Sequence, residues 1–474
     1  AEGGGNTLRV AVIGCSHGEL DRIYWLCEQL QKEQGDKPFD LVLCCGDFQA
    51  SGARSHALHR RQPRGVQLLA GIAVRRLGGA EHLLCWFAFA TSSEVFVLGY
   101  ANVLHFGGLR IAAWSGIYKG MDYSKGHYET PPFPNRGDKI SVYHVRSIEA
   151  FRLGLLRHGV SGGNAVDVLM THDWPNGITD YGNKELLLRI KPYFREDIEA
   201  NRLGNPASMQ LIQWLRPRYH FAGHLHVGWA AMVSHDVDEN EQPADPTRFL
   251  ALDKPIPGRH FLQVLDIPIP ADAPHKERSF AYDPEWLAVL KATDEMSKCS
   301  EKIFSLPTGA EATRLADVVR NLEEAERKPT PVPHYSDAFK RTGRIQKPTD
   351  PVRAQQPECY YKNPQTTAFC EQYSLHDINQ ELCDRAGPSN VGLAAWLTEN
   401  DGDDDPSPPL NQDEDPAFDE IKDGQDFMVL DKNPVSEESK NSYLEDWAPP
   451  QWKPESDQDE GETSTKRTKL ADVE

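Results

Sequence analysis

Cysteine, histidine and aspartate occur in this chain in four short polar clusters, each of which follows a hydrophobic segment. The clusters are Gly14-Cys15-Ser16-His17-Gly18-Glu19, Cys45-Gly46-Asp47-Phe48, Thr171-His172-Asp173-Trp174 and Gly223-His224-Leu225-His226. Thiolate, imidazole and carboxylate ligands together suit zinc, iron and manganese. A carboxylate can also bridge two metal ions about 3.5–4 Å apart, an arrangement that suits the hydrolysis of phosphoesters. The clusters therefore predict one metal site with two ions.

The spacing inside the clusters supports this interpretation. Cys15 and His17 are two residues apart, and so are His224 and His226, so each pair can direct both side chains toward one side of the chain. Asp47 has the short side chain that suits a bridging ligand. A single His-x-His is more often part of an ordinary loop, and an aspartate after a strand is often only a helix cap. Four such clusters in one chain favour the metal site.

The segments between the clusters predict an α/β fold. Residues 8–13 and 40–45 have the apolar runs of buried strands, and residues 19–33 between them repeat apolar side chains at helical spacing. In layered α/β folds ligands bind at the carboxyl ends of the strands. Further strands are predicted at 95–99, 109–114, 166–170, 219–222, 228–235, 248–252 and 261–267, and helices at 147–158, 207–215, 286–293 and 315–325. Two sheets packed face to face, with helices outside, would accommodate these elements.

The 474 residues suffice for one large domain and a second module, but the charge is uneven along the chain. Residues 383–474 contain 25 Asp and Glu against 8 Lys and Arg, which accounts for −17 of the total charge of −20. This acidic tail cannot bury enough apolar surface to fold, so we expect it to be disordered. Its basic cluster Lys466-Arg467-Thr468-Lys469 is a short candidate signal for nuclear import.

Nine cysteines without regular spacing fit reduced intracellular thiols better than a set of disulfides. The sequence has no run of the ~18 apolar residues that a membrane span requires, and no signal-peptide pattern. We therefore expect a soluble intracellular protein that does not bind membranes.

The order and types of the cluster residues resemble the calcineurin-like metallophosphoesterases, whose first motif usually reads Asp-x-His. Cys15 stands at the aspartate position here, and this departure, together with residues 42–50 (Val-Leu-Cys-Cys-Gly-Asp-Phe-Gln-Ala), resembles the RNA lariat debranching enzyme family. Six later segments strengthen the resemblance: 115–119, 143–146, 172–175, 181–184, 249–254 and 363–367. The match covers about residues 8–50, 96–300 and 360–382.

This resemblance implies a four-layer αββα sandwich of two mixed sheets. The implied catalytic domain spans residues 8–267, a C-terminal debranching-enzyme domain spans 268–382, and the acidic tail spans 383–474. The resemblance also implies that Cys15, His17 and His226 hold the first metal, that Asp47 bridges, and that His172 and His224 hold the second.

The family hydrolyses the 2′–5′ phosphodiester at the branch point of intron lariat RNA, with iron(II), zinc or manganese. The thiolate of Cys15 should favour zinc or iron(II) over magnesium. Ser115–Arg146 corresponds to the lariat recognition loop of the family, in which aromatic side chains stack on bases and cations meet phosphates. The residues implied to contact RNA are Tyr118, Lys119, Tyr123, Lys125, His127, Tyr128, Tyr143, His144 and Arg146.

One family motif is missing. The family supplies an asparagine ligand and an adjacent general-acid histidine from Gly-Asn-His-Glu, but residues 51–94 contain no such motif. Gly78-Gly79-Ala80-Glu81-His82 comes nearest and lacks the asparagine, so the catalytic acid is unassigned. The abrupt loss of resemblance after Ala50 and its return near Val95 suggest an out-of-frame or differently spliced coding segment.

These observations favour a nuclear, monomeric debranching phosphodiesterase that acts on branched intron RNA. A catalytically impaired lariat-binding or scaffold protein of the same fold is the first alternative, because the asparagine and the acid are absent. A general phosphatase of the superfamily is the second. The acidic tail would repel RNA, so it would either contact basic proteins or remain solvated.

Overall fold

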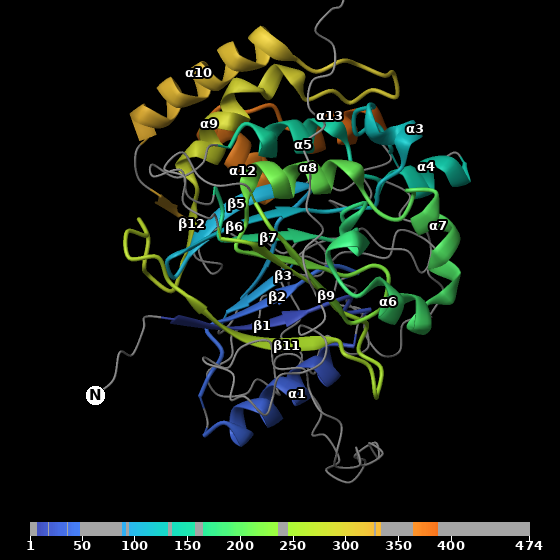
Figure 1. Cartoon of the computed structure of the whole chain (residues 1–474). Helices are drawn as coiled ribbons and strands as arrows, with labels where there is room; N and C mark the ends of the chain where they lie inside the picture. The colour runs from blue at the N-terminus through green and yellow to red at the C-terminus, as the bar shows by residue number, and fades with distance from the viewer. Residues whose placement is uncertain are drawn as a thin grey trace, which may run out of the picture.

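Two β-sheets pack face to face and carry helices on both outer surfaces, as the sequence predicts (Figure 1). The smaller sheet has the strand order β11 (Leu262–Pro268), β1 (Thr7–Ile13), β2 (Leu41–Cys44), β3 (Ala88–Thr91) and β4 (Glu94–Val97). The larger sheet has the order β13 (Thr330–Pro331), β12 (Phe280–Tyr282), β5 (Ala101–Phe106), β6 (Leu109–Trp114), β7 (Val168–Thr171), β8 (Tyr219–Ala222), β10 (Thr247–Ala251) and β9 (Trp229–Val233).

The computed structural model describes residues 7–17, 19–35, 37–47, 88–91, 94–130, 135–156, 165–235, 245–326, 329–332 and 364–386. Its α-helices are α1 (Leu20–Glu33), α3 (Gly120–Tyr123), α4 (Arg136–Ser141), α5 (Ser147–Gly154), α6 (Lys184–Ile190), α7 (Arg195–Glu199), α8 (Pro206–Leu215), α9 (Pro284–Ala292), α10 (Gly309–Glu326), α12 (Pro364–Tyr373) and α13 (Ile378–Ala386). Short 3₁₀ turns lie at η1 (Ile178–Tyr181), η2 (Pro192–Phe194) and η3 (Asp294–Met296).

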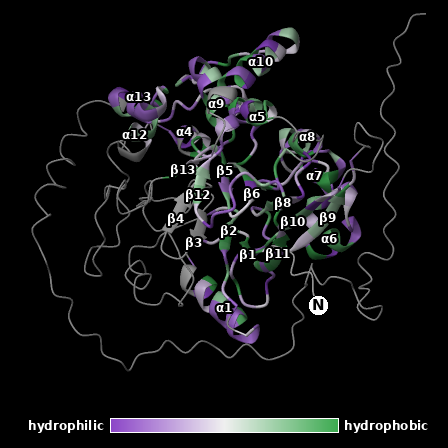
Figure 2. Ribbon diagram, turned by 90° about the vertical axis from the view of Figure 1, so that its left-hand side faces the viewer, coloured by the Kyte–Doolittle hydropathy of each residue, from purple (hydrophilic) through white to green (hydrophobic). Residues whose placement is uncertain are grey.

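Successive side chains of a strand point to opposite faces of its sheet, and this alternation explains the four layers. In β1, Val10 and Val12 lie in the core between the two sheets, whereas Ala11 and Ile13 lie in the core under α1. A strand that is apolar on both faces therefore needs a cover on each side. A third core, which includes Trp114 and Ile212, lies between the larger sheet and the helices α5, α8 and α9. Hydrophilic residues are frequent along α1, α10 and α13 at the outside of the molecule (Figure 2).

Parallel pairing brings the polar clusters to one edge of the sandwich. Strand β1 is parallel to β2, and the strands β6, β7, β8 and β10 form a parallel series. The carboxyl ends of parallel strands lie at the same edge, which is where ligands bind in α/β sheets. The clusters follow β1, β2, β7 and β8, so all four meet there.

Most predicted elements occur within a few residues of their expected bounds. The predicted helix 147–158 ends earlier, at Gly154, and the predicted helix 315–325 begins earlier, at Gly309. Strand β5 was not predicted, because Asn102 and His105 interrupt its apolar pattern. Helix α13 continues to Ala386, so the expected disorder from residue 383 is wrong for its first residues. Residues 387–474, including Lys466–Lys469, lie outside the described residues. None of the described helices is both long and apolar enough to cross a membrane.

An ion cluster joins the larger sheet to α9, the first of the C-terminal helices α9, α10, α12 and α13. The Arg110 guanidinium donates from Nε to Asp283 Oδ2 and from Nη2 to Asp283 Oδ1, at 2.8 and 2.9 Å. It also reaches Glu285 at 2.8 Å, and His105 lies 2.8 Å from Asp283. Burial alone would raise the pKa of Asp283, but the charges of Arg110 and His105 outweigh it and lower that pKa. Asp283 also caps α9 by accepting from the Trp286 amide.

Replacing Asp283 should therefore destabilise the fold. We expect Asp283→Ala to lower the free energy of unfolding by about 3–5 kcal/mol, because it removes both the main partner of the half-buried Arg110 guanidinium and the cap of α9. Urea denaturation followed by circular dichroism measures the change. Asp317→Ala on α10 is the matched control, because Asp317 pairs with Arg320 at the surface, where such pairs contribute at most about 1 kcal/mol. Equal effects of the two substitutions would contradict the proposed importance of the ion cluster.

Candidate metal centre

Six side chains converge at the edge of the sandwich where the parallel strands end. Cys15 and His17 follow β1, Asp47 follows β2, His172 follows β7, and His224 and His226 follow β8. One ligand atom from each of Cys15, His17, Asp47 and His226 lies within 4.8 Å of the other three. The structure thus brings together side chains that are up to 211 positions apart in the sequence.

Asp47 lies at the centre of this group. Its Oδ2 is 3.3 Å from His17 Nε2, 3.8 Å from His172 Nε2 and 3.9 Å from His226 Nε2. The ring of His224 lies next to that of His172, with 5.0 Å between the centroids. A carboxylate placed between two sets of ligands can bridge two cations. The assignment of each ligand to a particular ion stays a prediction.

His172 shows that the donor set fits a metal. Its Nδ1 lies 2.9 Å from the carbonyl oxygen of Cys45, and since a carbonyl only accepts, Nδ1 is the donor and the neutral ring offers the lone pair of Nε2 to a metal. This Nε2 is buried and has no hydrogen-bond partner within the described ranges. Buried polar atoms are rarely left unpaired, and a cation beside Asp47 would satisfy this one. A backbone partner on the second nitrogen is also typical of metal-binding histidines.

The electrostatics of the site keep its ligands in the forms that bind metals. Burial would raise the pKa of Asp47, but the imidazoles of His172, His226 and His17 hold it below its usual value. Burial lowers the pKa of His224 to about 3, and it also lowers that of His17, with a contribution from Lys254. Metals bind neutral imidazoles and ionised carboxylates, so both shifts favour binding near neutral pH.

The backbone at the site is strained. His17, Asp47, His224 and His226 all have φ between 44° and 61°, the left-handed region that residues other than glycine rarely adopt. Such strain persists only where surrounding contacts impose it, and it concentrates at functional sites. The amide of His17 donates to the Asp47 carbonyl at 2.9 Å, and the amide of Gly223 donates to the His172 carbonyl at 3.1 Å. These bonds tie the loops together in pairs.

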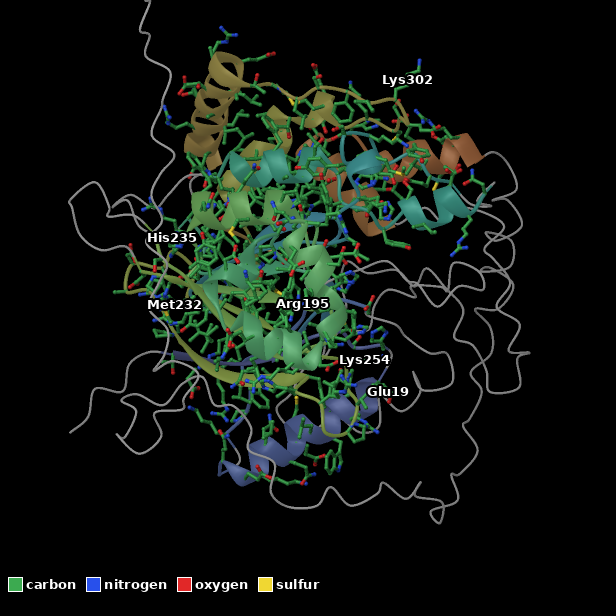
Figure 3. All side chains as sticks on the ribbon, turned by 45° about the vertical axis from the view of Figure 1, so that its right-hand side comes forward. Glu19, Arg195, Met232, His235, Lys254 and Lys302 are labelled. Carbon is green, nitrogen blue, oxygen red and sulfur yellow. The ribbon has the colours of Figure 1, made fainter. Side chains whose placement is uncertain are left out.

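Two further charged residues adjoin the centre and were not assigned from the sequence. Asp173 is buried and accepts from the amides of Tyr118 and Trp174 at 3.0 and 2.9 Å, and burial raises its pKa to about 6. Lys254 follows β10 and lies at the end of the sandwich where α1 begins (Figure 3). Asp173 belongs to the third polar cluster and Lys254 ends the matching segment 249–254, so both carried a signal that sequence reasoning did not use.

The segment predicted to recognise the lariat, residues 115–146, which we call the recognition loop, is attached beside His172. The amide of Ile117 donates to the Tyr143 carbonyl at 3.1 Å, and the amide of Val145 donates to the Ile117 carbonyl at 3.0 Å. Because Asp173 holds the Tyr118 amide, the loop begins next to the metal ligands. RNA bound to this loop would therefore lie close to the metal centre.

The side chains predicted to contact RNA differ in how deeply they are buried. Lys119 is exposed, and the half-buried ones are Tyr118, Tyr123, Lys125, Tyr128 and Tyr143. His127, His144 and Arg146 are buried, and each pairs with a carboxylate: Glu149 at 2.8 Å, Asp122 at 2.8 Å and Glu129 at 2.5 Å, respectively. Direct RNA contact by these three side chains does not fit their burial. They hold the shape of the loop from inside, because buried charges need partners.

The segment that lacks the family motif is described only at its end. Residues 51–87, including His82, lie outside the described residues, and so does Phe48. Ala88–Thr91 forms β3, which pairs antiparallel with β2 and places Ala90 opposite Val42. The smaller sheet therefore continues past β2.

Two family models match the chain. The model for calcineurin-like phosphoesterases matches residues 8–228, and the model for the C-terminal domain of lariat debranching enzymes matches residues 244–378. The boundary between these models falls inside the larger sheet, between β8 and β10. The fold and the site thus define a calcineurin-like phosphoesterase, a class that implies a divalent metal site.

Several relatives are similar over most of the chain. The lariat debranching enzyme of Caenorhabditis briggsae is 36% identical over 470 residues, which cover 92% of this chain and 88% of the relative. That of Caenorhabditis elegans is 35% identical and covers 94% and 91%, and that of Homo sapiens is 36% identical and covers 79% and 70%. The chain belongs to the lariat debranching enzyme family.

A substitution at Gly46 would test the placement of His172. A Cβ atom at Gly46 would lie 1.9 Å from His172 Nδ1, and the φ of +139° also disfavours any other residue. We expect Gly46→Ala to displace the imidazole and to lower the amount of metal bound per chain, measured by elemental analysis after dialysis. Losing the partner that orients a metal ligand typically costs about 10–100-fold in metal affinity.

Gly35→Ala is the matched control for Gly46→Ala. Gly35 also has a positive φ, +74°, but no atom lies within 4 Å of its Cβ position, so only the backbone strain is shared. We expect this variant to retain its metal. A Gly46→Ala protein with the metal content of the control would contradict the close packing of His172.

Proposed function

We propose that this chain hydrolyses the 2′–5′ phosphodiester at the branch point of intron lariat RNA. The observation that carries the proposal is the convergence of five candidate metal ligands around Asp47 beside a loop rich in aromatic and basic residues. The names of the relatives, lariat debranching enzymes that match over most of this chain, support the same activity.

The metal-binding residues would divide the work between two ions. Cys15, His17 and His226 would hold one ion, His172 and His224 the other, and Asp47 would bridge. Bound divalent ions supply positive charge to the phosphate oxygens and lower the pKa of water. Asp47 stays ionised among its imidazoles, so it can keep both positions in place.

Other residues would place the RNA. Lys254 lies near enough to His17 for its charge to act on that imidazole, so its ammonium can also attract a phosphate at the centre. Asp173 fixes the start of the recognition loop through the Tyr118 amide. The exposed Lys119 and the half-buried tyrosines of the loop offer a phosphate contact and rings on which unpaired bases can stack.

We also propose that iron(II), zinc or manganese occupies the centre, and that Cys15 shifts the preference toward zinc or iron(II). Soft thiolate ligands favour these metals, whereas carboxylates suit manganese and magnesium. Cys15→Asp should therefore raise the manganese-to-zinc ratio bound from an equimolar mixture, measured by elemental analysis. Cys27→Ala, a buried cysteine in the core under α1, is the control and should leave the ratio unchanged. An unaltered ratio in Cys15→Asp would show that the thiolate does not select the metal.

Location and partners follow from the same proposal. A debranching enzyme that acts on excised introns would work in the nucleus, and Lys466–Lys469 is a candidate import signal. We propose that the chain acts as a monomer and that its acidic tail, which would repel RNA, contacts basic proteins.

The proposed activity is tested with a synthetic RNA that carries one 2′–5′ branch. We expect metal-loaded protein to release the 2′ branch and to leave a linear 3′–5′ RNA of the same sequence intact, as resolved by gel electrophoresis. His172→Ala should abolish cleavage, since it removes a predicted ligand. Tight binding of the branched RNA without cleavage would instead favour a lariat-binding protein, and faster cleavage of phosphoserine peptides would favour a general phosphatase.

Residues 51–87 provide a second test of the reaction. If these residues lack the general acid, the chain should cleave branched RNA about 10²–10⁴-fold more slowly than a chimera that carries the corresponding Gly-Asn-His-Glu segment of a relative. Both proteins should bind branched RNA with similar affinity, because the recognition loop is unchanged. Equal cleavage rates would show that another residue already supplies the proton.

A further inference from the structure

A stretch of the C-terminal part, which we call the bracing segment (Thr293–Phe304), runs beside the recognition loop. The amide of Gly126 in the loop donates to the carbonyl of Ser300 at 2.8 Å, and the amide of Phe304 donates to the carbonyl of Ser124 at 3.1 Å. Lys302, from the same segment, projects to the outside of the molecule (Figure 3). Two backbone bonds thus join chain segments that lie about 175 positions apart in the sequence.

Gly126 allows this contact to be unusually close. A Cβ atom at Gly126 would lie 1.7 Å from the carbonyl oxygen of Lys298, so any other residue would push the two backbones apart. The Gly126 carbonyl in turn accepts from Arg146 Nε at 3.1 Å. Arg146 is fully buried and also bonds Glu129, so the contact with the bracing segment continues into the interior of the recognition loop.

A side chain of α5 holds the bracing segment from another direction. Arg152 donates to the hydroxyl oxygens of Thr293 and Ser297 at 2.8 and 2.6 Å. Three residues earlier on α5, Glu149 pairs with His127 of the loop at 2.8 Å. Helix α5 therefore contacts the loop and the bracing segment at the same time.

The C-terminal helices fix the bracing segment in its turn. The amide of His376, just before α13, donates to the carboxylate of Asp294 at 2.9 Å, and Arg385 on α13 bonds the carbonyl of Cys299. Figure 1 shows the helices α9, α10, α12 and α13 grouped on one side of the sandwich. The bracing segment thus contacts both this group of helices and the recognition loop.

Contacts inside the recognition loop continue from Gly126 toward the candidate metal centre. His144 Nδ1 lies 2.8 Å from Asp122, and Asp122 is 3.0 Å from Lys125, the neighbour of Gly126. Near the start of the loop, the amide of Tyr118 donates to the carboxylate of Asp173, the neighbour of His172. The regular structure described within the loop is limited to the short helices α3 and α4, so the shape of the loop depends mainly on such contacts.

We propose that the bracing segment positions the recognition loop for binding branched RNA, and that this is a function of the C-terminal helices. The inference rests on the proposed function. It makes Gly126 and Arg152 positioning residues, which act on RNA binding through the shape of the loop and do not touch the reacting atoms. Loosening the contact should weaken RNA binding while the metal centre keeps its ligands.

The test uses the full chain with Gly126→Ala and measures two substrates. We expect the KM for branched RNA to rise roughly 10-fold or more while kcat changes less than about 3-fold, because uniform binding is lost and the chemistry is not. Hydrolysis of the small diester bis(4-nitrophenyl) phosphate and the bound metal should stay at the level of the unmodified chain. Gly154→Ala is the matched control, since the last residue of α5 has open space at its Cβ position.

Arg152→Met supplies a second variant that does not depend on the tolerance of Gly126 for a methyl group. It keeps the apolar stem and removes the two hydroxyl contacts, so we expect a rise in KM in the same direction and unchanged hydrolysis of the small diester. Parallel losses with both substrates and of metal would overturn the proposal, because the segment would then only stabilise the fold. An unchanged KM for branched RNA in both variants would also overturn it.

The unmodified chain separates this proposal from the proposed function. If it hydrolyses the small diester and fails to cleave branched RNA, the debranching activity is refuted. If it cleaves branched RNA and both variants do so with unchanged KM, only the positioning role is refuted.

Discussion

The crowding of ligand groups around the carboxylate of Asp47 is the constraint on which the rest of the structure depends. Three imidazole nitrogens lie within 3.9 Å of one oxygen atom, and four of the converging residues have left-handed backbones. Neither the strain nor the dense packing of lone pairs is favourable by itself. Both persist because the ends of four strands are held by the two packed sheets, and because cations stabilise such a set of donors.

The two sheets that support the site contain strands from the first to the last part of the described β structure. Strand β11 pairs with β1 along seven residues, from Thr7 opposite Pro268 to Ile13 opposite Leu262, so β1 is held by a strand that begins 249 positions after β1 ends. Strand β12 extends the larger sheet beyond β5, and the Arg110–Asp283 pair ties β6 to the start of α9. The part of the chain that matches the phosphoesterase model and the C-terminal helices are therefore continuous in structure, and these helices contact the bracing segment beside the recognition loop.

Charges in the recognition loop have two physical roles. Arg146, His127 and His144 are paired with carboxylates inside, where desolvation makes an unpaired charge costly and the pair specifies one geometry. Lys119 remains at the surface, where a cation keeps its hydration until a phosphate approaches. A loop that is ordered from inside presents its outer side chains in a fixed arrangement, which reduces the entropy lost when RNA binds.

The local elements and the candidate metal ligands could be predicted from the amino-acid sequence. Strand and helix periodicity depends on neighbours a few residues away, and Cys15, His17, Asp47, His172, His224 and His226 carry ligand chemistry at strand ends, so both can be read along the chain. Which charged side chains are buried, and which groups they contact, depends on the packed fold and could not be predicted in this way. Arg110 pairs with Asp283, which lies 173 positions later in the sequence. The close contact at Gly126 depends on the carbonyl of Lys298. Such pairings have no local signal, because they arise when sheets, helices and loops pack.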